Sequence, residues 1–427
     1  MPSPTSAGWQ SLNEKLQIQK RLSEGEGPIF VTANEIKLIA RREPRLMTKF
    51  DTRESRPGLL ANATILPVSN GTYAVLPGDG YADVPSAKEY RSMPVPKLIR
   101  SLETLPWSTG PSSESQALDM AQATGILEDF LNDSVRLTIR GRLRSPRIEF
   151  FFDGGGRRIP VTAEGVQIEV DSGLEGERIH LVEAKLGTRT NFHIRQLFYP
   201  YRMWHTLVPT KQVSSIFLSW SNRCFSLRSF SFVDSENYHG LVPIAATDYF
   251  LDEPQPIPSL HELLSSSRVE AQPSGLPFPQ ADDFRRVIDV TDAVAVGIST
   301  REQLAARYDF DHRQADYYAN AAAYLGFLER TGRSFCLTQT GAQFVARSRS
   351  GRLAVVLQQM CKLPVFRELL ESAANGHTLP LREEVAELIT RATGLSGQTP
   401  LRRALTVLSW TRWALSVETA LTAIEHE

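Results

Sequence analysis

The chain has 427 residues and a formal net charge of -1, and 41% of its residues are hydrophobic. This length is sufficient for two or three domains, each with its own core. The sequence has no apolar run near eighteen residues and starts with the polar segment MPSPTSAGWQSLNEK, so we expect a cytoplasmic protein with no signal peptide and no membrane partner. The scattered Cys224, Cys336 and Cys361 indicate neither a disulfide framework nor a zinc site.

Residues 1–110 predict an N-terminal α+β segment. The run 62–76, NATILPVSNGTYAVL, reads as two strands around Asn70-Gly71, a dipeptide that favours a tight hairpin turn. Between residues 35 and 56, seven basic residues accompany four acids. Arginine pairs with phosphate in a fixed geometry, so we interpret this segment as a DNA-recognition surface.

Residues 111–250 predict an α/β domain in which a mixed sheet is flanked by helices. Its expected elements are a helix at 114–133, strands at 147–153, 166–171 and 179–185, a helix at 191–207 and a strand at 213–221. Side chains alternate between the two faces of a strand, so Glu169 and Asp171 share one face while Glu183 and Lys185 share a face of the next strand. A hairpin would bring Asp171 beside Glu183.

Two carboxylates beside a lysine suit metal-dependent hydrolysis of a phosphodiester. Hard oxygen ligands bind Mg²⁺, and we expect Asp171, Glu183 and the carbonyl group of Ala184 to hold the ion. A bound Mg²⁺ acidifies a coordinated water and neutralises charge on a phosphate oxygen. Lys185 would orient the attacking water and stabilise developing negative charge.

The spacing of these residues resembles the PD-(D/E)XK nuclease superfamily, here as Asp171 followed after eleven residues by Glu183-Ala184-Lys185. Val170 stands where the superfamily motif has proline. The resemblance implies three accessory candidates, Glu114, Glu169 and Gln196. Glu114 competes with Glu128 and Asp129 as a first-helix ligand and equally suits a charge at a helix start, whereas the helix of Gln196 equally suits packing on the sheet.

The bare E-x-K pattern has an internal control in Glu35-Ile36-Lys37, which lies in a segment that reads as a helix. Such charges more often form a solvated face, so the order of helices and strands carries the argument.

The stretch 134–158 has seven arginines against two acids. We expect Arg140, Arg142 and Arg144 to line a DNA cleft, with a mixed-charge surface as the alternative.

Residues 251–282 are rich in proline and serine and predict a linker without regular structure.

Residues 283–427 predict a mostly helical region. Its segment 299–344 reads as helix, tight turn, longer helix, hairpin and helix, which resembles a winged helix-turn-helix. The second helix would present Arg313, Gln314 and Tyr317 to the major groove; protein association is the alternative role.

Most of the chain resembles type II restriction endonucleases of the PD-(D/E)XK superfamily, through EPRLMTKFD (43–51), ESQALDMAQATGILEDFL (114–131), IEVD to EAK (168–185), FHIRQLFYPYR (192–202) and FDHRQADYYANAAAYLGFLE (310–329). The resemblance implies a prokaryotic homodimer that cleaves double-stranded DNA at a short specific site with Mg²⁺, functionally paired with a DNA methyltransferase. The alternatives are a nuclease of the same superfamily that acts on branched, damaged or modified DNA, and a non-enzymatic winged-helix regulator.

Overall fold

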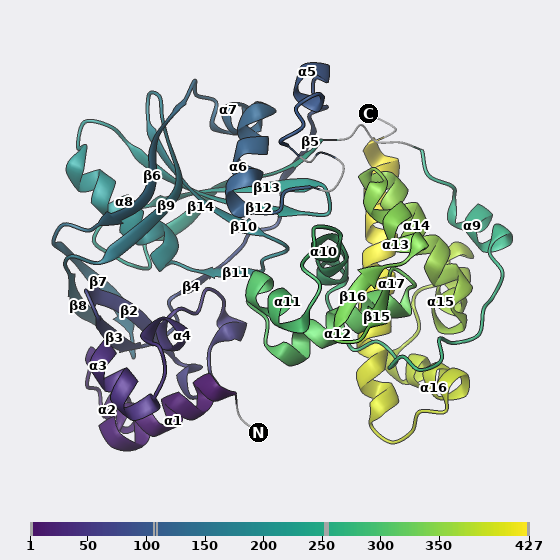
Figure 1. Cartoon of the computed structure of the whole chain (residues 1–427), viewed down its shortest axis with the longest axis horizontal. Helices are drawn as coiled ribbons and strands as arrows, with labels where there is room; N and C mark the ends of the chain where they lie inside the picture. The colour runs from purple at the N-terminus through teal and green to yellow at the C-terminus, as the bar shows by residue number, and fades with distance from the viewer. Residues whose placement is uncertain (1–2, 106, 108–109, 252–255, 425–427) are drawn as a thin grey trace.

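The computed structural model describes residues 3–105, 107, 110–251 and 256–424. The protein is mixed α/β, as expected, and its sheets and helices form three regions along the chain (Figure 1). Every helix in the described residues is too short or too polar to span a lipid bilayer.

The N-terminal region is a small three-stranded sheet covered by short helices. Its strands are β1 (Ile29–Thr32), β2 (Ala63–Ser69) and β3 (Thr72–Pro77), in the order β1-β3-β2. The turn between β2 and β3 is formed by Asn70 and Gly71, and Gly71 has φ +83°, so the predicted hairpin is confirmed. The helices are α1 (Pro4–Leu16), α2 (Ile18–Ser23), α3 (Ala33–Glu35) and α4 (Pro44–Thr48), with further helical turns at Ile36–Ala40, Arg53–Ser55 and Gly58–Leu60.

The central region is built on a seven-stranded sheet. In spatial order the strands are β5 (Glu89–Ser92), β14 (Leu241–Phe250), β13 (Cys224–Phe232), β12 (Val213–Ser221), β10 (Ile179–Leu186), β9 (Gln167–Glu175) and β6 (Arg136–Arg144). The pairs β10/β12 and β14/β5 are parallel and the other pairs are antiparallel. Two further two-stranded sheets are formed by β4 (Tyr81–Asp83) with β11 (Asn191–His193) and by β7 (Ile148–Gly154) with β8 (Arg157–Ala163).

Helices cover both faces of this sheet. α8 (Arg195–Leu207) packs its apolar face with Leu181 and Phe217 on one side. On the other side, α6 (Glu114–Ala123) and α7 (Ile126–Leu131) pack against Val182 and Leu218. α5 (Lys97–Arg100) precedes them in the chain. Alternate residues of β10 and β12 therefore enter two cores, as in a strand buried on both faces.

Three expected elements of this region exist but differ from the expectation in their position or extent. The strand expected at 147–153 is β7, which pairs with β8 outside the main sheet; its place beside β9 is taken by the arginine-rich β6. The helix expected at 114–133 is divided at Thr124–Gly125 into α6 and α7. The helix expected at 191–207 starts only at Arg195, after the short strand β11.

A fourth difference concerns the domain boundary expected at residue 110. β4 and β5 lie before that residue but pair with β11 and β14 of the central region. The N-terminal sheet ends instead with β3, at Pro77. Only the short connection Gly78-Asp79-Gly80 separates β3 from β4.

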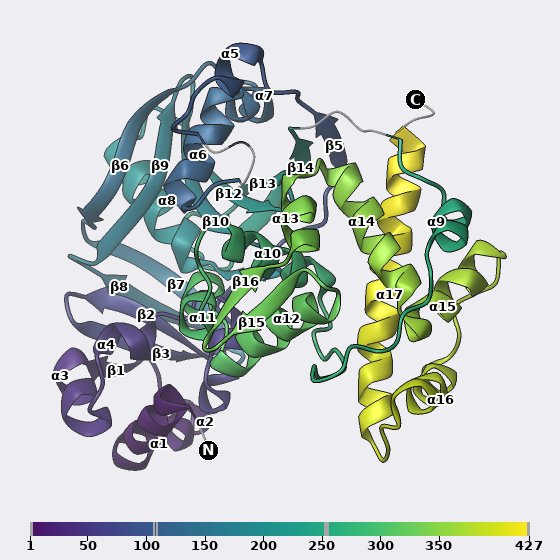
Figure 2. The same cartoon turned by 45° about the vertical axis from the view of Figure 1, so that its right-hand side comes forward.

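The C-terminal region has one large core formed by helices and a two-stranded hairpin. Its elements are α10 (Phe284–Ala295), α11 (Arg301–Tyr308), α12 (His312–Tyr324), β15 (Leu328–Thr331), β16 (Ser334–Leu337), α13 (Gln339–Ala346), α14 (Arg349–Lys362), α15 (Pro364–Ala374), α16 (Arg382–Thr393) and α17 (Thr399–Ile424). The expected order of helix, turn, helix, hairpin and helix over 299–344 is confirmed. Figure 2 shows α17 extending the length of this region beside α14, α15 and α16.

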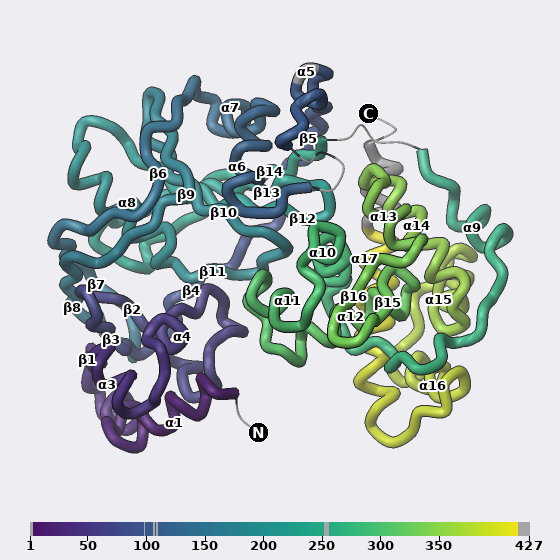
Figure 3. Tube along the Cα trace, viewed as in Figure 1, coloured from purple at the N-terminus to yellow at the C-terminus, as the bar shows by residue number. Residues whose placement is uncertain are grey.

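The linker expected at 251–282 is largely an ordered part of this region. It contains α9 (Leu260–Ser266), which starts at a capping box between Ser259 and Glu262, and Leu263 and Phe278 are buried in the C-terminal core. In Figure 3 the segment runs along the outer side of the helices before it reaches α10. Residues 252–255 of the expected linker lie outside the described residues. Leucines at helical spacing thus outweigh the surrounding prolines.

The central and C-terminal regions meet at a buried polar contact. Asp289 of α10 accepts hydrogen bonds from the Thr188 backbone N–H at 2.7 Å and from Ser221 Oγ at 2.6 Å. The Tyr308 hydroxyl donates to the Asp289 carbonyl at 2.5 Å. Gly187, with φ +79°, permits this approach, because a Cβ atom there would lie 2.5 Å from Cε1 of Tyr308. The contact attaches α10 directly to the end of β10.

Candidate active site

The β9/β10 hairpin places Asp171 beside the Glu183-Ala184-Lys185 segment. Ser172 lies opposite Val182 in the antiparallel register, and one residue further along, Asp171 Oδ2 accepts a hydrogen bond of 3.0 Å from the Ala184 N–H. The side-chain oxygen thus satisfies a backbone donor of β10. The structure therefore places the Asp171 carboxylate beside β10, the strand that carries Glu183 and Lys185.

Lys185 is the centre of a buried charge cluster. Its Nζ donates to Glu183 Oε1 at 2.6 Å and to the Ala184 carbonyl oxygen at 3.1 Å. Glu114 Oε1, from the first residue of α6, lies 3.5 Å from the same nitrogen. Because Lys185 is only 9% exposed, this nitrogen depends on protein oxygens rather than bulk water for its partners.

Gln196 of α8 completes the contacts of Glu183. Its Nε2 donates to Glu183 Oε1 at 2.6 Å. Its Oε1 is buried and has no hydrogen-bond partner in the described structure. Unsatisfied buried acceptors are costly, so this oxygen is available to a water molecule or a cation. Of the proposed accessory residues, Glu114 and Gln196 join the cluster.

The other accessory candidates pair with residues outside the cluster. Glu169 is exposed at the rim and pairs with Arg142 at 3.4 Å. Glu128 pairs with Arg136 at 3.6 Å, and Asp129 accepts hydrogen bonds from Arg91 and Tyr249 at 2.7 and 2.6 Å. Of the three acids considered on the first helix, only Glu114 reaches Lys185.

The cluster holds more negative charge than its lysine offsets. Burial raises the pKa of Glu183 to about 8, and the nearby Asp171 and Glu114 add to this effect while Lys185 opposes it. Burial would lower the pKa of Lys185, but Glu183 and Glu114 outweigh it and hold the pKa above its usual value. Glu183 would ionise fully at neutral pH only with additional positive charge nearby.

The oxygen atoms present suit a hard divalent cation. The carboxylates of Asp171 and Glu183 and the Ala184 carbonyl are all oxygen donors, as Mg²⁺ prefers. Within the described residues no three side chains of His, Cys, Asp or Glu form a group able to hold a metal. An ion here would therefore rest on two carboxylates, a carbonyl oxygen and water, a set that is compatible with Mg²⁺.

The cluster lies in a cleft of about 550 Å³ between the N-terminal and central regions. The N-terminal wall is formed by α4 and the residues after it, including Arg45, Lys49 and Asp51. Lys49 and Arg195 lie 3.5 and 3.6 Å from the Asp51 carboxylate. Burial would raise the pKa of Asp51, but Lys185, Lys49 and Arg195 outweigh it and hold the pKa below its usual value.

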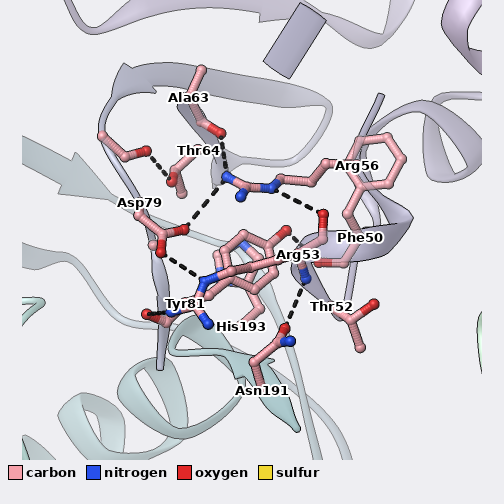
Figure 4. A network of polar contacts seen from close by, with 12 residues as sticks. Phe50, Thr52, Arg53, Arg56, Ala63, Thr64, Asp79, Tyr81, Asn191 and His193 are labelled. Atoms are coloured by element: carbon pink, nitrogen blue, oxygen red, sulfur yellow. Dashed lines mark hydrogen bonds and ion pairs between the residues drawn. The ribbon is translucent and has the colours of Figure 1, made fainter. Parts of the chain in front are cut away.

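A polar network holds this wall in place (Figure 4). The Arg53 and Arg56 guanidinium groups both reach Asp79, at 2.8 and 3.4 Å. The backbone N–H of Arg53 donates to Asn191 Oδ1 at 2.8 Å. Since Asn191 lies on β11 just before α8, the contact fixes the chain after Asp51 to the helix that carries Gln196.

Asp51 and Arg195 were missed by the sequence reasoning. The segment EPRLMTKFD was noted for its resemblance and its basic surroundings, but nothing in its spacing indicates that an acid of this segment lies near Lys185. Arg195 begins α8 directly before Gln196. Because Arg195 is adjacent to Gln196, which was expected near the site, the sequence did offer one indication that Arg195 lies in the cleft.

The three arginines expected to bind DNA lie on β6, the edge strand of the main sheet. Arg140, Arg142 and Arg144 are all exposed. Arg142 lines the cleft, whereas Arg140 lies 3.5 Å from Asp119. Arg144 has no ion pair among the described residues.

The expected DNA-reading residues of α12 do not lie at the cleft. The Gln314 side chain accepts a hydrogen bond from the Asp311 N–H at 3.2 Å and closes the capping box of its own helix. Arg313 and Tyr317 line a separate pocket beside α12. The hydrogen-bonding capacity of Gln314 is thus partly committed within the protein.

Three family models match the chain, and each describes a domain of unknown function. Residues 6–75 match DUF6996, residues 77–250 match DUF6997, and residues 286–419 match DUF7226. No curated protein and no solved structure matches the chain significantly. The matched ranges correspond to the N-terminal, central and C-terminal regions, and the first two meet at the cleft.

Proposed function

We propose that the protein is a Mg²⁺-dependent endonuclease that hydrolyses phosphodiester bonds of duplex DNA at a short specific sequence, in the manner of a type II restriction endonuclease of the PD-(D/E)XK superfamily. The observation that carries the proposal is the convergence of Asp171, Glu183 and Lys185 in one cleft. A prokaryotic, cytoplasmic homodimer and a partner DNA methyltransferase belong to the same proposal.

Asp171 and Glu183 would hold the ion, together with the Ala184 carbonyl oxygen. The ion would supply a more acidic water and a positive charge against a phosphate oxygen. Gln196 fixes the Glu183 carboxylate by donating to its Oε1 at 2.6 Å. A carboxylate held from a helix needs little rearrangement when charge develops during the reaction.

Lys185 supplies a second positive charge. Its Nζ is held between Glu183 and Glu114, so the ammonium group keeps a defined position without a ligand. Within the cleft it would donate to the attacking water or to a phosphate oxygen. Glu114 is a positioning residue in this proposal, because it acts through Lys185.

The walls of the cleft provide the cations that a DNA backbone requires. Arg45 and Lys49 come from the N-terminal wall, Arg195 from α8 and Arg142 from the edge strand. Cationic side chains on opposite sides of a cleft neutralise phosphates of a bound strand and give salt-dependent binding. The lining as a whole is balanced, with five basic side chains against five acids, so a bound Mg²⁺ would leave the cleft positive toward phosphates.

The test is cleavage of unmethylated plasmid DNA in Mg²⁺ by the wild-type protein and by Asp171→Asn, Glu183→Gln and Lys185→Met. We expect discrete fragments from the wild type and at least a hundredfold slower cutting by each variant, with duplex binding retained in Ca²⁺. Lys37→Met is the matched control, since Lys37 belongs to the other E-x-K segment, is exposed and does not line the cleft.

The possible results separate the alternatives. Wild-type cutting rates in all three variants would refute the site. If intact plasmid is not cut but branched or modified duplexes are cut, the site stands and the restriction function is wrong. Metal-independent binding with no cutting of any substrate would favour a regulator. If the cleavage activity elutes with the dimer peak in size-exclusion chromatography, the result would support the homodimer.

A further inference from the structure

We infer that a pocket beside α12, separate from the proposed nuclease cleft, binds a small phosphorylated ligand of nucleotide size. The pocket has a volume of about 430 Å³, within the range of small-molecule sites. Its polar lining comes from α11, α12, β15 and α17 and includes Arg301, Arg313, Tyr317, Asn320, Arg330 and Arg403. We call it the α12 pocket.

Four arginines line the α12 pocket, and two of them pair with carboxylates. Arg301 lies 3.1 Å from Glu302 and 3.4 Å from Asp316, and Arg330 lies 3.6 Å from the other Asp316 oxygen. Arg313 and Arg403 have no carboxylate partner in the described part of the chain. The pocket therefore has two positive charges in excess, which an anion would neutralise.

Arg403 is the most informative of these side chains. It is half-buried on α17, and its Nε is buried with no hydrogen-bond partner among the described residues. Burial lowers the pKa of Arg403, and the neighbouring Arg402 adds to this effect. A guanidinium group remains charged in proteins, so this one is held in a costly place without a compensating anion. A ligand oxygen would satisfy both its charge and its free N–H.

The arrangement of the arginines suits a phosphate group. Guanidinium groups bind phosphate oxygens through paired N–H donors, and here they approach from four different elements. Each element can serve a different oxygen of a tetrahedral anion. His312 at the start of α12 adds a fifth basic group to the lining.

The rest of the lining suits the flat, polar remainder of a nucleotide. Tyr317 offers an aromatic ring, and Asn320 and Gln280 offer amide groups. Aromatic rings stack on bases, and amides pair with their edges. Pro277, Phe278 and Ala321 supply apolar surface. The lining thus combines a cationic part with a part suited to a ring system.

The shape of the site favours a free ligand over duplex DNA. A helix that reads DNA must project into the major groove, whereas the segment 277–280 forms a wall beside α12. Phe278 anchors that wall by packing edge-on against Tyr324, with the ring centroids 5.5 Å apart. Phosphates on the convex surface of a duplex would reach only the rim, formed by exposed residues such as Arg313.

The test is isothermal titration of the full-length protein with ADP in EDTA, with pyrophosphate and a cleft-binding DNA duplex as separate competitors. We expect one ADP per chain, displaced by pyrophosphate and not by the duplex. Arg403→Gln and Arg313→Ala should each weaken ADP binding at least tenfold. Arg402→Gln is the matched control, because it removes an exposed arginine next to Arg403 that does not line the pocket.

Arg313 is exposed, so its replacement tests the pocket even if Arg403→Gln unfolds the protein. Lys185→Met, which alters only the nuclease cleft, should bind ADP as the wild type does. No ADP binding at millimolar concentration would overturn the inference, as would equal loss in Arg402→Gln. Displacement of ADP by the duplex would assign the pocket to DNA phosphates instead.

Discussion

Asp289 provides a sharp test of how the C-terminal region is attached. This carboxylate belongs to α10, is 3% exposed, and faces the ends of β10 and β12. Burial raises its pKa from 3.8 to about 6; the hydrogen bonds from Ser221 and Thr188 oppose the shift, and Asp292 adds to it. The variant Asp289→Asn keeps the shape of the side chain and removes its titration.

The sign of the effect follows from the raised pKa. Between about pH 4 and pH 6 the folded protein binds a proton at Asp289 that the unfolded chain releases, so the free energy of unfolding falls as the pH rises through this window. A shift of about two pKa units corresponds to roughly 3 kcal/mol. Between pH 4 and pH 8, the free energy of unfolding of the wild type should therefore fall by roughly 3 kcal/mol relative to that of Asp289→Asn.

The assay is urea denaturation of both proteins at several pH values, because the difference between them isolates this carboxylate. Glu387→Gln, which removes an exposed acid of α16, is the control and should give a difference that does not change with pH. A constant difference between wild type and Asp289→Asn over the whole range would refute the reasoning. It would mean that the carboxylate is either solvated or ionised equally in both states.

Three further predictions concern the sheet and the cleft. Gly173→Ala should lower the free energy of unfolding by about 1–3 kcal/mol, because the new Cβ would lie 2.5 Å from Cβ of Ile139; Gly58→Ala, with nothing within 4 Å, should leave the urea midpoint unchanged, and equal midpoints for both would contradict the packing. Replacing Arg142 with Ala should weaken binding to specific and non-specific duplexes alike and reduce the slope of log K against log salt by roughly one, whereas a loss at the cognate site alone would indicate base contact. Asp51→Asn should raise the KM for DNA or slow cutting without changing the free energy of unfolding by more than about 1 kcal/mol, since Lys49 and Arg195 lose the carboxylate that positions them; unchanged kinetics would separate the N-terminal wall from the reaction.

The sequence was most informative where local patterns decide the structure. The Asn70-Gly71 turn and the alternation around Asp171 and Glu183 correctly predicted two hairpins, because turn geometry and a buried strand face fix the register. Proline content was misleading at 251–282, where Leu260 and Leu263 form a helix that packs on the core. Composition does not show whether a segment has a surface to bury its leucines against.

Contacts between distant segments could not be predicted from the sequence. The strand expected at 147–153 is β7, whereas β6, noted in the sequence only for its arginines, is the strand that pairs with β9. Asp51 is far from Glu183 and Lys185 in the chain, and its place in the cleft depends on Arg53 and the network around Asp79. Such placements follow from tertiary packing, which no periodicity in a single sequence records.

The cleft is shared between two stretches that match different families. Residues 6–75 contribute the basic wall with Arg45 and Lys49, and residues 77–250 contribute Glu183 and Lys185. An exchange of residues 77–250 alone between related chains would transfer the carboxylates and the lysine but leave behind the surface that faces them. The smallest transplantable unit is therefore the pair of stretches, joined through Arg53 and Asn191.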